Sequence, residues 1–326
     1  MDKNNISNIK TNYSNNTKDI TFSTKTNQNS SFFPNLSSMF DDFIGFFKPD
    51  ENSTKPKIFK DQCCSCSKTH SNDYCDSIYD ILQMTKNNNI DKKSKQMYEN
   101  LLKVHEKSLD FNGENLRQIK KDINRTYPST TIFKKERILN KLKNVLRAFS
   151  NYDNTIKYIQ GMNFIVGFFL LHCDEHIAFW LFVALFEEYN YREIFSKNFP
   201  GLKKHVDNVK FILEKYSPKL YKELDQAGVT YEIFMIEWLY SLFSSIIPLE
   251  LLMGFYKGFF CEGWKFFYKM CISIITSAKG NFNGPEEVYI VFKFGTLDDK
   301  ITQEFTNEYW KKIIHNAYFI DIDGCL

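Results

Sequence analysis

The sequence predicts an all-α protein, a two-lobed bundle of many short helices that follows a disordered N-terminal tail. Apolar residues recur at helical spacing from about residue 70 onward, and only one segment has the composition of a β-strand. Hydrophobic residues make up 43% of the chain, which is enough for a buried core, and the 32 Phe residues make that core largely aromatic. The length of 326 residues suits about two domains or one two-lobed domain.

Residues 1–58 are expected to form the tail. Up to about residue 30 the chain is mostly Asn, Ser, Thr and Lys, which bury too little apolar surface to offset the entropy cost of ordering. The segment from Phe32 to Phe47 predicts a short helix, because its apolar residues repeat at helical spacing between Pro34 and Pro49. This helix is a candidate for docking on a membrane or a partner. The favoured interpretation is that it packs on the protein's own body.

Residues 59–74 are expected to form a linker that contains cysteines. Cys63 and Cys66 have the interval of a zinc-binding pair, but His70 and Cys75 complete no standard zinc template. Adjacent thiols are also candidates for lipidation. The spacing favours a polar loop without a metal, and it leaves zinc binding and lipidation as alternatives.

The rest of the chain predicts helices. The clearest covers residues 133–149, where one face carries Ile138, Leu142, Val145, Leu146 and Phe149. Residues 162–171 and 177–186 are apolar almost all round, so they are expected to be buried helices. Residues 288–294 fit a strand or a short helix ending at Gly295 equally well. Further helices are expected over residues 77–85, 92–104, 206–216, 231–244, 249–260 and 264–275.

Composition and missing motifs argue against several classes of protein. A net charge of +3 gives no sign of the concentrated basic face that nucleic acid binding needs. The longest apolar run, around residues 164–171, is far shorter than the roughly 20 residues of a membrane-spanning helix. No export signal is recognised, so a cytoplasmic location with reduced thiols is expected. The chain also lacks Walker, GxGxxG, HExxH and GxSxG motifs.

Residues 119–128 contain a charged pair. Asp122 and Arg125 are three residues apart, so a helical turn places them on one face, where the carboxylate can orient the guanidinium. The sequence Thr126-Tyr127-Pro128 then ends the helix, which leaves Arg125 near an exposed end. Taken alone, this pattern is better explained by an ordinary surface ion pair.

Residues 158–163 open the apolar helix of residues 162–171. Gln160 is a polar side chain at the mouth of this helix, and Gly161 exposes the backbone beside it. This arrangement suggests a side chain that is directed at a ligand. The alternative is a helix cap with an incidental amide.

Together, the two segments resemble the two signature motifs of the TBC domain, the GTPase-activating domain for Rab GTPases. The pattern IxxDxxR(T)(F/Y)P is matched by Ile119, Asp122, Arg125, Thr126, Tyr127 and Pro128. The pattern YxQGMN is matched by Tyr158, Gln160, Gly161, Met162 and Asn163. The resemblance covers about residues 75–280, and it implies a TBC-like fold for the domain of residues 75–326.

The resemblance also implies an activity. The protein would be an activator, not itself an enzyme, for a Rab-type small GTPase in its GTP form. Arg125 would be the arginine finger and Gln160 the glutamine finger, both supplied in trans, and Asp122 would orient Arg125. The remaining motif residues would shape the site or contact the GTPase; they are Tyr158, Gly161 and Asn163.

The implied partner would bring its own nucleotide and metal. GTP and Mg²⁺ would arrive with the GTPase, so no cofactor and no metal site are expected. The activity would regulate vesicle trafficking, in the cytoplasm or peripherally on endomembranes through the GTPase.

The sequence departs from the family at three places. The family's RxxxW is reduced to an aromatic at Tyr79, and its RxWD is replaced by residues 254–257. Lys157 stands where relatives have Gly, close to Gln160. These departures leave an alternative function open, a non-catalytic TBC-like scaffold that binds a small GTPase or an effector.

Overall fold

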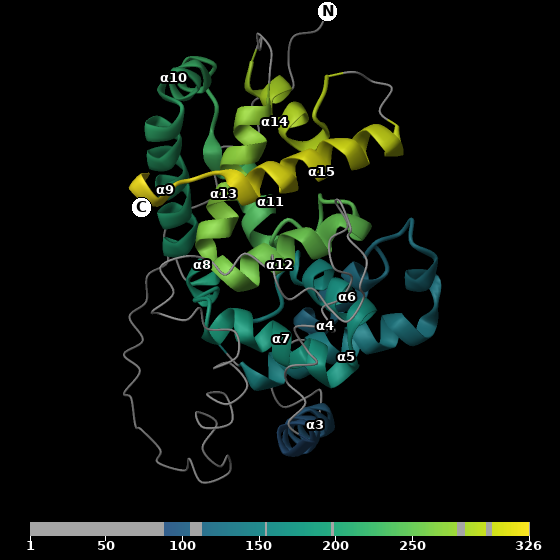
Figure 1. Ribbon diagram of the computed structural model, residues 1–326. Helices are drawn as coiled ribbons and strands as arrows, with labels where there is room; N and C mark the ends of the chain where they lie inside the picture. The colour runs from purple at the N-terminus through teal and green to yellow at the C-terminus, as the bar shows by residue number, and fades with distance from the viewer. Residues whose placement is uncertain are drawn as a thin grey trace, which may run out of the picture.

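The computed structural model describes residues 88–104, 113–153, 155–196, 199–278, 284–297 and 302–325. These residues form α-helices and short 3-10 helices without any strand, as the sequence predicts (Figure 1). The predicted tail, the Phe-rich helix from Phe32 to Phe47, the cysteine linker of residues 59–74 and the helix expected over residues 77–85 lie outside the described residues.

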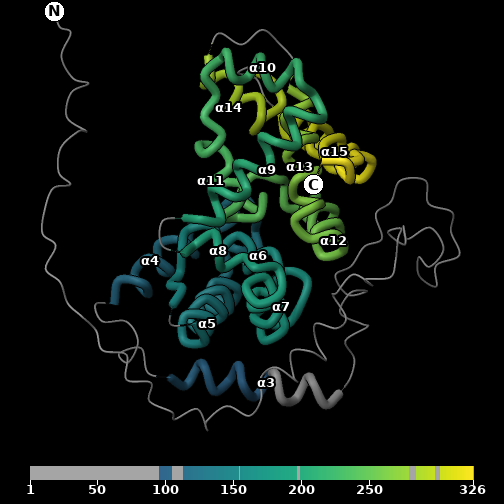
Figure 2. Tube along the Cα trace, turned by 90° about the vertical axis from the view of Figure 1, so that its left-hand side faces the viewer, coloured from purple at the N-terminus to yellow at the C-terminus, as the bar shows by residue number. Residues whose placement is uncertain are grey.

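The helices form two lobes, which lie one above the other in Figure 2. The lower lobe contains α3 (Asn88–Lys103), α4 (Glu114–Ile123), η1 (Thr131–Lys134), α5 (Glu136–Tyr152), α6 (Met162–His172), α7 (Glu175–Glu187) and α8 (Arg192–Phe195). The upper lobe contains α9 (Pro200–Tyr216), α10 (Pro218–Gln226), α11 (Tyr231–Ser241), η2 (Leu249–Leu251), α12 (Leu252–Glu262), α13 (Trp264–Ser277), α14 (Pro285–Phe294), α15 (Gln303–Phe319) and η3 (Asp323–Cys325).

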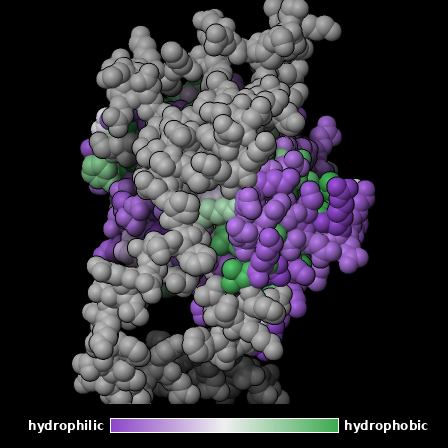
Figure 3. All heavy atoms as spheres, turned by 90° about the horizontal axis from the view of Figure 1, so that it is seen from below, coloured by the Kyte–Doolittle hydropathy of each residue, from purple (hydrophilic) through white to green (hydrophobic). Residues whose placement is uncertain are grey.

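The lower lobe is organised around α5, α6 and α7. The predicted apolar face of α5 is buried in full, and it packs against α3, α4, α6 and α7. Helices α6 and α7 are buried almost all round, as their composition predicts. Seen from below, the described surface is mostly hydrophilic with small hydrophobic areas (Figure 3). Helix α6 also contacts α11 of the upper lobe, so it joins the two lobes.

The structure decides between the alternatives for residues 288–294. They belong to helix α14, which ends at Gly295 with φ 79°, and the Gly295 N–H donates to the carbonyl of Val291 at 2.8 Å. The helix expected over residues 231–244 is shorter than predicted, because Leu242 and Phe243 have positive φ angles and end α11 at Ser241.

Residues 254–257, which replace the family's RxWD, serve packing. A Cβ atom at Gly254 would lie 3.0 Å from Ile314 of α15, so a glycine lets α12 and α15 approach closely. The ring of Tyr256 stacks on Phe168 of α6 at 4.8 Å, and its hydroxyl lies 2.7 Å from that of Ser244. No helix of the described residues is long and apolar enough to cross a bilayer.

Candidate functional site

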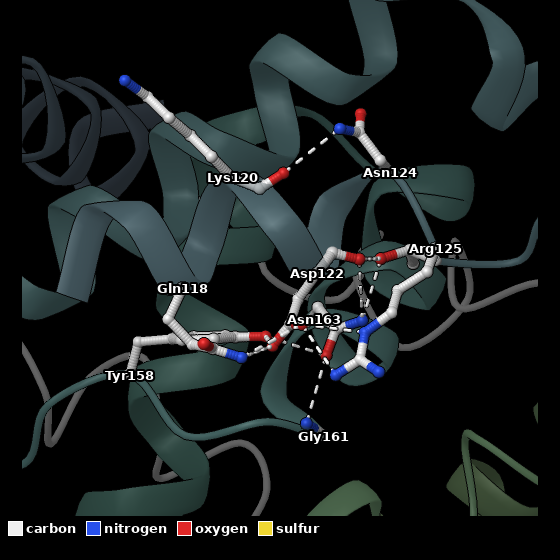
Figure 4. Close-up of polar contacts among 9 residues, drawn as sticks. Gln118, Lys120, Asp122, Asn124, Arg125, Tyr158, Gly161 and Asn163 are labelled. Atoms are coloured by element: carbon white, nitrogen blue, oxygen red, sulfur yellow. Dashed lines mark hydrogen bonds and ion pairs between the residues drawn. The ribbon is translucent and has the colours of Figure 1, made fainter. Parts of the chain in front are cut away.

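The two sequence motifs meet where α4 ends and α6 begins (Figure 4). The chain turns directly after α4, where the Arg125 N–H donates to the carbonyl of Asp122 at 3.1 Å. Tyr127 then takes a φ angle of 45°, which is uncommon for a residue with a side chain. The Tyr127 hydroxyl holds this turn, because it lies 2.9 Å from the carbonyl of Phe164 in α6 and 3.1 Å from that of Ser244 in the upper lobe.

Asp122 holds the guanidinium of Arg125. The Nε atom of Arg125 donates to Oδ1 of Asp122 at 2.8 Å, and its Nη2 atom forms an ion pair with the same oxygen at 2.7 Å. The Asp122 side chain is 1% exposed, whereas that of Arg125 is 51% exposed. The carboxylate therefore fixes the guanidinium from the protein side (Figure 4), while half of the arginine side chain stays accessible.

The other Asp122 oxygen binds the second motif. The Tyr158 hydroxyl lies 2.6 Å from Oδ2, and Nε2 of Gln118 lies 3.1 and 3.3 Å from the two carboxylate oxygens. Burial and the hydrogen bond to Asp122 raise the pKa of Tyr158 far above its usual value. Tyr158 is therefore a neutral hydroxyl that donates to the carboxylate at any physiological pH.

Asn163 connects the two motifs a second time. This fully buried side chain donates from Nδ2 to the Thr126 hydroxyl at 2.8 Å. Its Oδ1 accepts the Gly161 N–H at 3.1 Å and lies 3.0 Å from the Tyr158 hydroxyl. The amide thus fixes the backbone at the mouth of α6 against the turn that carries Arg125 (Figure 4).

The backbone geometry at the N-terminal end of α6 requires a glycine at position 161. Its φ angle is 114°, and a Cβ atom at this position would lie 2.5 Å from the carbonyl oxygen of Tyr240 in α11. Only glycine allows this conformation and this approach to a neighbouring backbone. Gln160, one residue earlier, is exposed. Arg125 therefore belongs to the polar network and Gln160 precedes the residue whose N–H the network holds, and both side chains are accessible.

Two residues of this network were missed by the sequence reasoning. Gln118 is four residues before Asp122 on α4, and this spacing was a local signal for a contact. Asn115 had no such signal, because its partners are distant in sequence. Its Oδ1 accepts the Tyr158 N–H at 3.0 Å, and its Nδ2 donates to the Ser150 hydroxyl at 3.0 Å.

Asp153 fixes the start of the segment that leads to Gln160. Its Oδ1 accepts the N–H and the hydroxyl of Thr155, at 2.8 and 2.7 Å, and the N–H of Ile156 at 3.1 Å. Its Oδ2 forms an ion pair with Arg192 of α8. Burial alone would raise the pKa of Asp153, but these hydrogen bonds outweigh it and leave the pKa below its usual value.

The described residues offer no metal site. No group of three or more His, Cys, Asp or Glu residues in this part of the chain is arranged to hold an ion. His172 and His176 are four residues apart, a spacing that suits a metal-binding pair on one helix. His172 is the last residue of α6 and His176 lies in α7, so the two do not share a helix. The candidate site instead presents an oriented cation and an exposed carboxamide, which suit the completion of another molecule's site.

The fold and the site define a two-lobed all-α domain of the TBC class. Residues 64–281 match the Rab-GTPase-TBC domain, which is about two thirds of the chain. The protein therefore belongs to the Rab-GTPase-TBC domain family. All of α14 and all of α15 lie beyond the matched residues.

Part of the chain is similar to several curated proteins. The GTPase-activating protein GYP5 of Saccharomyces cerevisiae is 28% identical over 67% of this chain and 23% of its own length. The Rab GTPase-activating protein eat-17 of Caenorhabditis elegans is 32% identical over 49% of this chain and 18% of its own. Growth hormone-regulated TBC protein 1 of Xenopus tropicalis is 30% identical over 49% of this chain and 48% of its own. The chain thus matches less than half of the length of each of these relatives.

Two solved structures share the fold. The Chlamydomonas flagellar RabGAP TBC domain superposes with a TM-score of 0.57, at 18% identity, over 75% of this chain and 79% of that domain. The Ypt/Rab-GAP domain of Gyp1p gives a TM-score of 0.58, at 15% identity, over 73% and 84%. At this level of identity the comparison supports the fold and not the details of the site.

Proposed function

We propose that the protein is a GTPase-activating protein for a Rab-type small GTPase in its GTP-bound form, and that it supplies Arg125 and Gln160 in trans. The observation that carries this proposal is that both side chains are exposed beside one buried polar network, which holds the guanidinium of Arg125 directly and, through the Gly161 N–H, the backbone next to Gln160. Membership in the Rab-GTPase-TBC domain family supports the same conclusion.

Arg125 acts on charge in this mechanism. Negative charge develops on the phosphate oxygens in the transition state of GTP hydrolysis, and an inserted arginine neutralises it. The guanidinium is always charged and planar, so it can contact two oxygens at once. Asp122 holds Nε and Nη2 before the GTPase binds, so less side-chain entropy is lost when Arg125 enters the nucleotide pocket.

Gln160 acts on the attacking water. A carboxamide accepts a hydrogen bond through its oxygen and donates through its nitrogen, so it can hold the water in line with the phosphate while it contacts the GTPase. The anchoring of the Gly161 N–H by Asn163 fixes the backbone next to Gln160. The side chain itself stays free to enter the partner.

The GTPase carries out the reaction, and this protein completes its active site. GTP and Mg²⁺ belong to the GTPase, so the activator needs no cofactor of its own. A Rab-type partner would connect the activity with vesicle trafficking, in the cytoplasm or peripherally on endomembranes.

The test is single-turnover phosphate release from a panel of GTP-loaded Rab-type GTPases. We expect the wild-type protein to accelerate at least one of them, and Arg125→Ala to remove about 10³-fold or more of that acceleration. Gln160→Ala should also abolish most of it. Arg137→Ala, which changes an exposed arginine of α5, is the matched control and should leave the rate unchanged.

Binding distinguishes activation from the scaffold alternative. The finger variants should still bind the GTPase and should melt at the wild-type temperature. A wild-type protein that binds a GTPase without accelerating it, or whose rate is insensitive to Arg125→Ala and Gln160→Ala, would instead be a non-catalytic scaffold.

A further inference from the structure

Helix α11 has apolar residues on its exposed side. Ile233 is 57% exposed and Ile236 is 40% exposed, although surface helices ordinarily present polar residues to water. Ile233, Ile236 and Tyr240 are spaced by three and four residues, so they lie on one face of the helix. The buried face of α11 is apolar as well, which is typical of a helix that is covered on both sides.

Helix α14 extends this surface. Lys293 of α14 forms an ion pair with Glu237 of α11 at 3.1 Å, and the Tyr289 hydroxyl accepts the Thr230 N–H at 3.0 Å, so the two helices run in the same direction. Phe234 of α11 also packs on Phe292 of α14, with ring centroids 5.1 Å apart. The exposed residues Ile233, Ile236, Ile290 and Phe294 are called the apolar strip below.

The apolar strip adjoins the candidate site. The carbonyl of Tyr240, in the last turn of α11, is the group that packs against Gly161. Ile233 is seven residues earlier, about 10 Å along the helix axis. In Figure 2, α4, α11 and α14 lie along one side of the molecule, and α12 and α15 lie along the other.

The usual size of a protein–protein interface indicates that a GTPase bound at the two fingers would also cover the apolar strip. A specific interface buries about 800 Å² on each partner, which corresponds to a disc of about 16 Å radius. A GTPase that receives Arg125 and Gln160 must be centred near Gly161, so its footprint extends over α11. An exposed apolar surface with a charged pair at its edge is also typical of a protein interaction site.

We propose that the apolar strip is a second docking surface for the same GTPase, and that it selects GTPases with an apolar surface beside the nucleotide pocket. The inference rests on the proposed function, because the fingers define where the partner lies. All of α14, including Ile290 and Phe294, lies beyond residues 64–281, which match the family. An apolar surface beside the two fingers is suited to choosing a partner, because partners differ in the surface that they offer to it.

The test compares Ile233→Ser/Ile236→Ser with Phe319→Ser in single-turnover hydrolysis at increasing concentration of activator. The exposed fractions of the two isoleucines, 57% and 40%, add up to about one whole side chain. Losing the burial of that much apolar surface in the complex should raise the half-saturating concentration of activator about tenfold, with a much smaller effect on the saturated rate. Phe319 is 75% exposed on α15, on the other side of the molecule, and its replacement should change neither quantity. Circular dichroism melting should show that all variants fold.

The outcomes separate this inference from the proposed function. An unchanged half-saturating concentration in the double variant would overturn the docking surface and leave the finger mechanism intact. A double variant that changes only self-association in sedimentation would overturn it too, since a second copy would then cover the strip. If the wild-type protein binds a GTPase without accelerating hydrolysis, the double variant should raise the dissociation constant of that complex about tenfold. A wild-type protein that neither accelerates nor binds any GTPase refutes both proposals.

Discussion

The carboxylate of Asp122 offers the sharpest test of how the arginine finger is held. The substitution Asp122→Asn keeps the size of the side chain but removes its charge. Oδ1 of Asp122 accepts a hydrogen bond from Nε of Arg125 and forms an ion pair with Nη2, and Oδ2 accepts a hydrogen bond from the Tyr158 hydroxyl. An asparagine has a single acceptor oxygen and a donor nitrogen, so it cannot serve both partners as the carboxylate does.

The size of the effect follows from these contacts. A hydrogen bond to a charged group contributes about 1.5–3 kcal/mol when it is buried, and the Arg125 bonds are worth less because half of that side chain is exposed to solvent. We therefore expect the activation rate to fall about 10- to 100-fold, which corresponds to about 1.4–2.7 kcal/mol in the barrier. The disturbed pairing of the buried Tyr158 hydroxyl should lower the free energy of unfolding by about 1–3 kcal/mol.

The assay is single-turnover phosphate release at saturating activator, combined with urea unfolding of the variant. Asn124→Ala is the matched control, because Asn124 is exposed at the end of the same helix and donates only to the carbonyl of Lys120 at 3.3 Å. It should stay within about twofold of the wild-type rate, as expected for a weak exposed hydrogen bond. If Asp122→Asn retains the wild-type rate in a folded protein, then Asp122 does not orient Arg125.

Three further substitutions test the surroundings of the site and of the core. Gly161→Ala should lower both the melting temperature and the activation rate, because the new Cβ would clash with the Tyr240 carbonyl and the φ angle of 114° disfavours a side chain. Tyr127→Phe should lower the free energy of unfolding by about 1 kcal/mol in urea titrations, because it leaves the buried carbonyl of Ser244 without its hydroxyl donor. His205→Asn should flatten the pH dependence of stability. Burial lowers the pKa of His205 to about 4, so between pH 4 and about 6.5 the unfolded chain binds more protons, and wild-type stability falls by up to about 3 kcal/mol as the pH is lowered through this range.

Each of these expectations has either a control variant or a result that would contradict it. Gly228→Ala carries the strain of a positive φ angle without a clash, so it should cost less than Gly161→Ala; an equal cost would show that the contact with α11 is unimportant. A Tyr127→Phe protein of unchanged stability would mean that water replaces the lost donor. A wild-type urea midpoint that is constant between pH 4 and 6.5 would contradict the low pKa of His205.

The sequence predicted the parts of the fold that are local. The apolar face of α5 repeats every three to four residues, so its burial follows from periodicity alone. Helix α15 was missed although its buried residues Trp310, Ile313, Ile314 and Ala317 have the same helical spacing, so this helix was predictable from the sequence. Helix α10 offers no such pattern, since Leu224 is its one buried residue.

The contacts of the candidate site were also predictable from the sequence only where they are local. The contact between Asp122 and Arg125 follows from their spacing on one helical turn. The contact between Asn115 and the backbone of Tyr158 spans 43 residues, and no local pattern encodes it. The role of Gly161 was predicted only in part. The sequence suggested an exposed backbone, whereas the structure shows a backbone pressed against Tyr240, which is distant in sequence.

The segments that carry the two proposed fingers both contact the upper lobe, although neither segment belongs to it. Tyr127 ties the turn that carries Arg125 to the carbonyl of Ser244, and Gly161 fixes the segment that carries Gln160 against Tyr240. Tyr240 and Ser244 flank the same short stretch, where Leu242 and Phe243 adopt positive φ angles at the end of α11. Because Ile233 and Ile236 of the apolar strip lie on that same helix, a GTPase bound to them would contact the element against which the segments of Arg125 and Gln160 are positioned. In the proposed mechanism, partner selection and finger alignment share one structural support, and a change in the packing of α11 should affect both together.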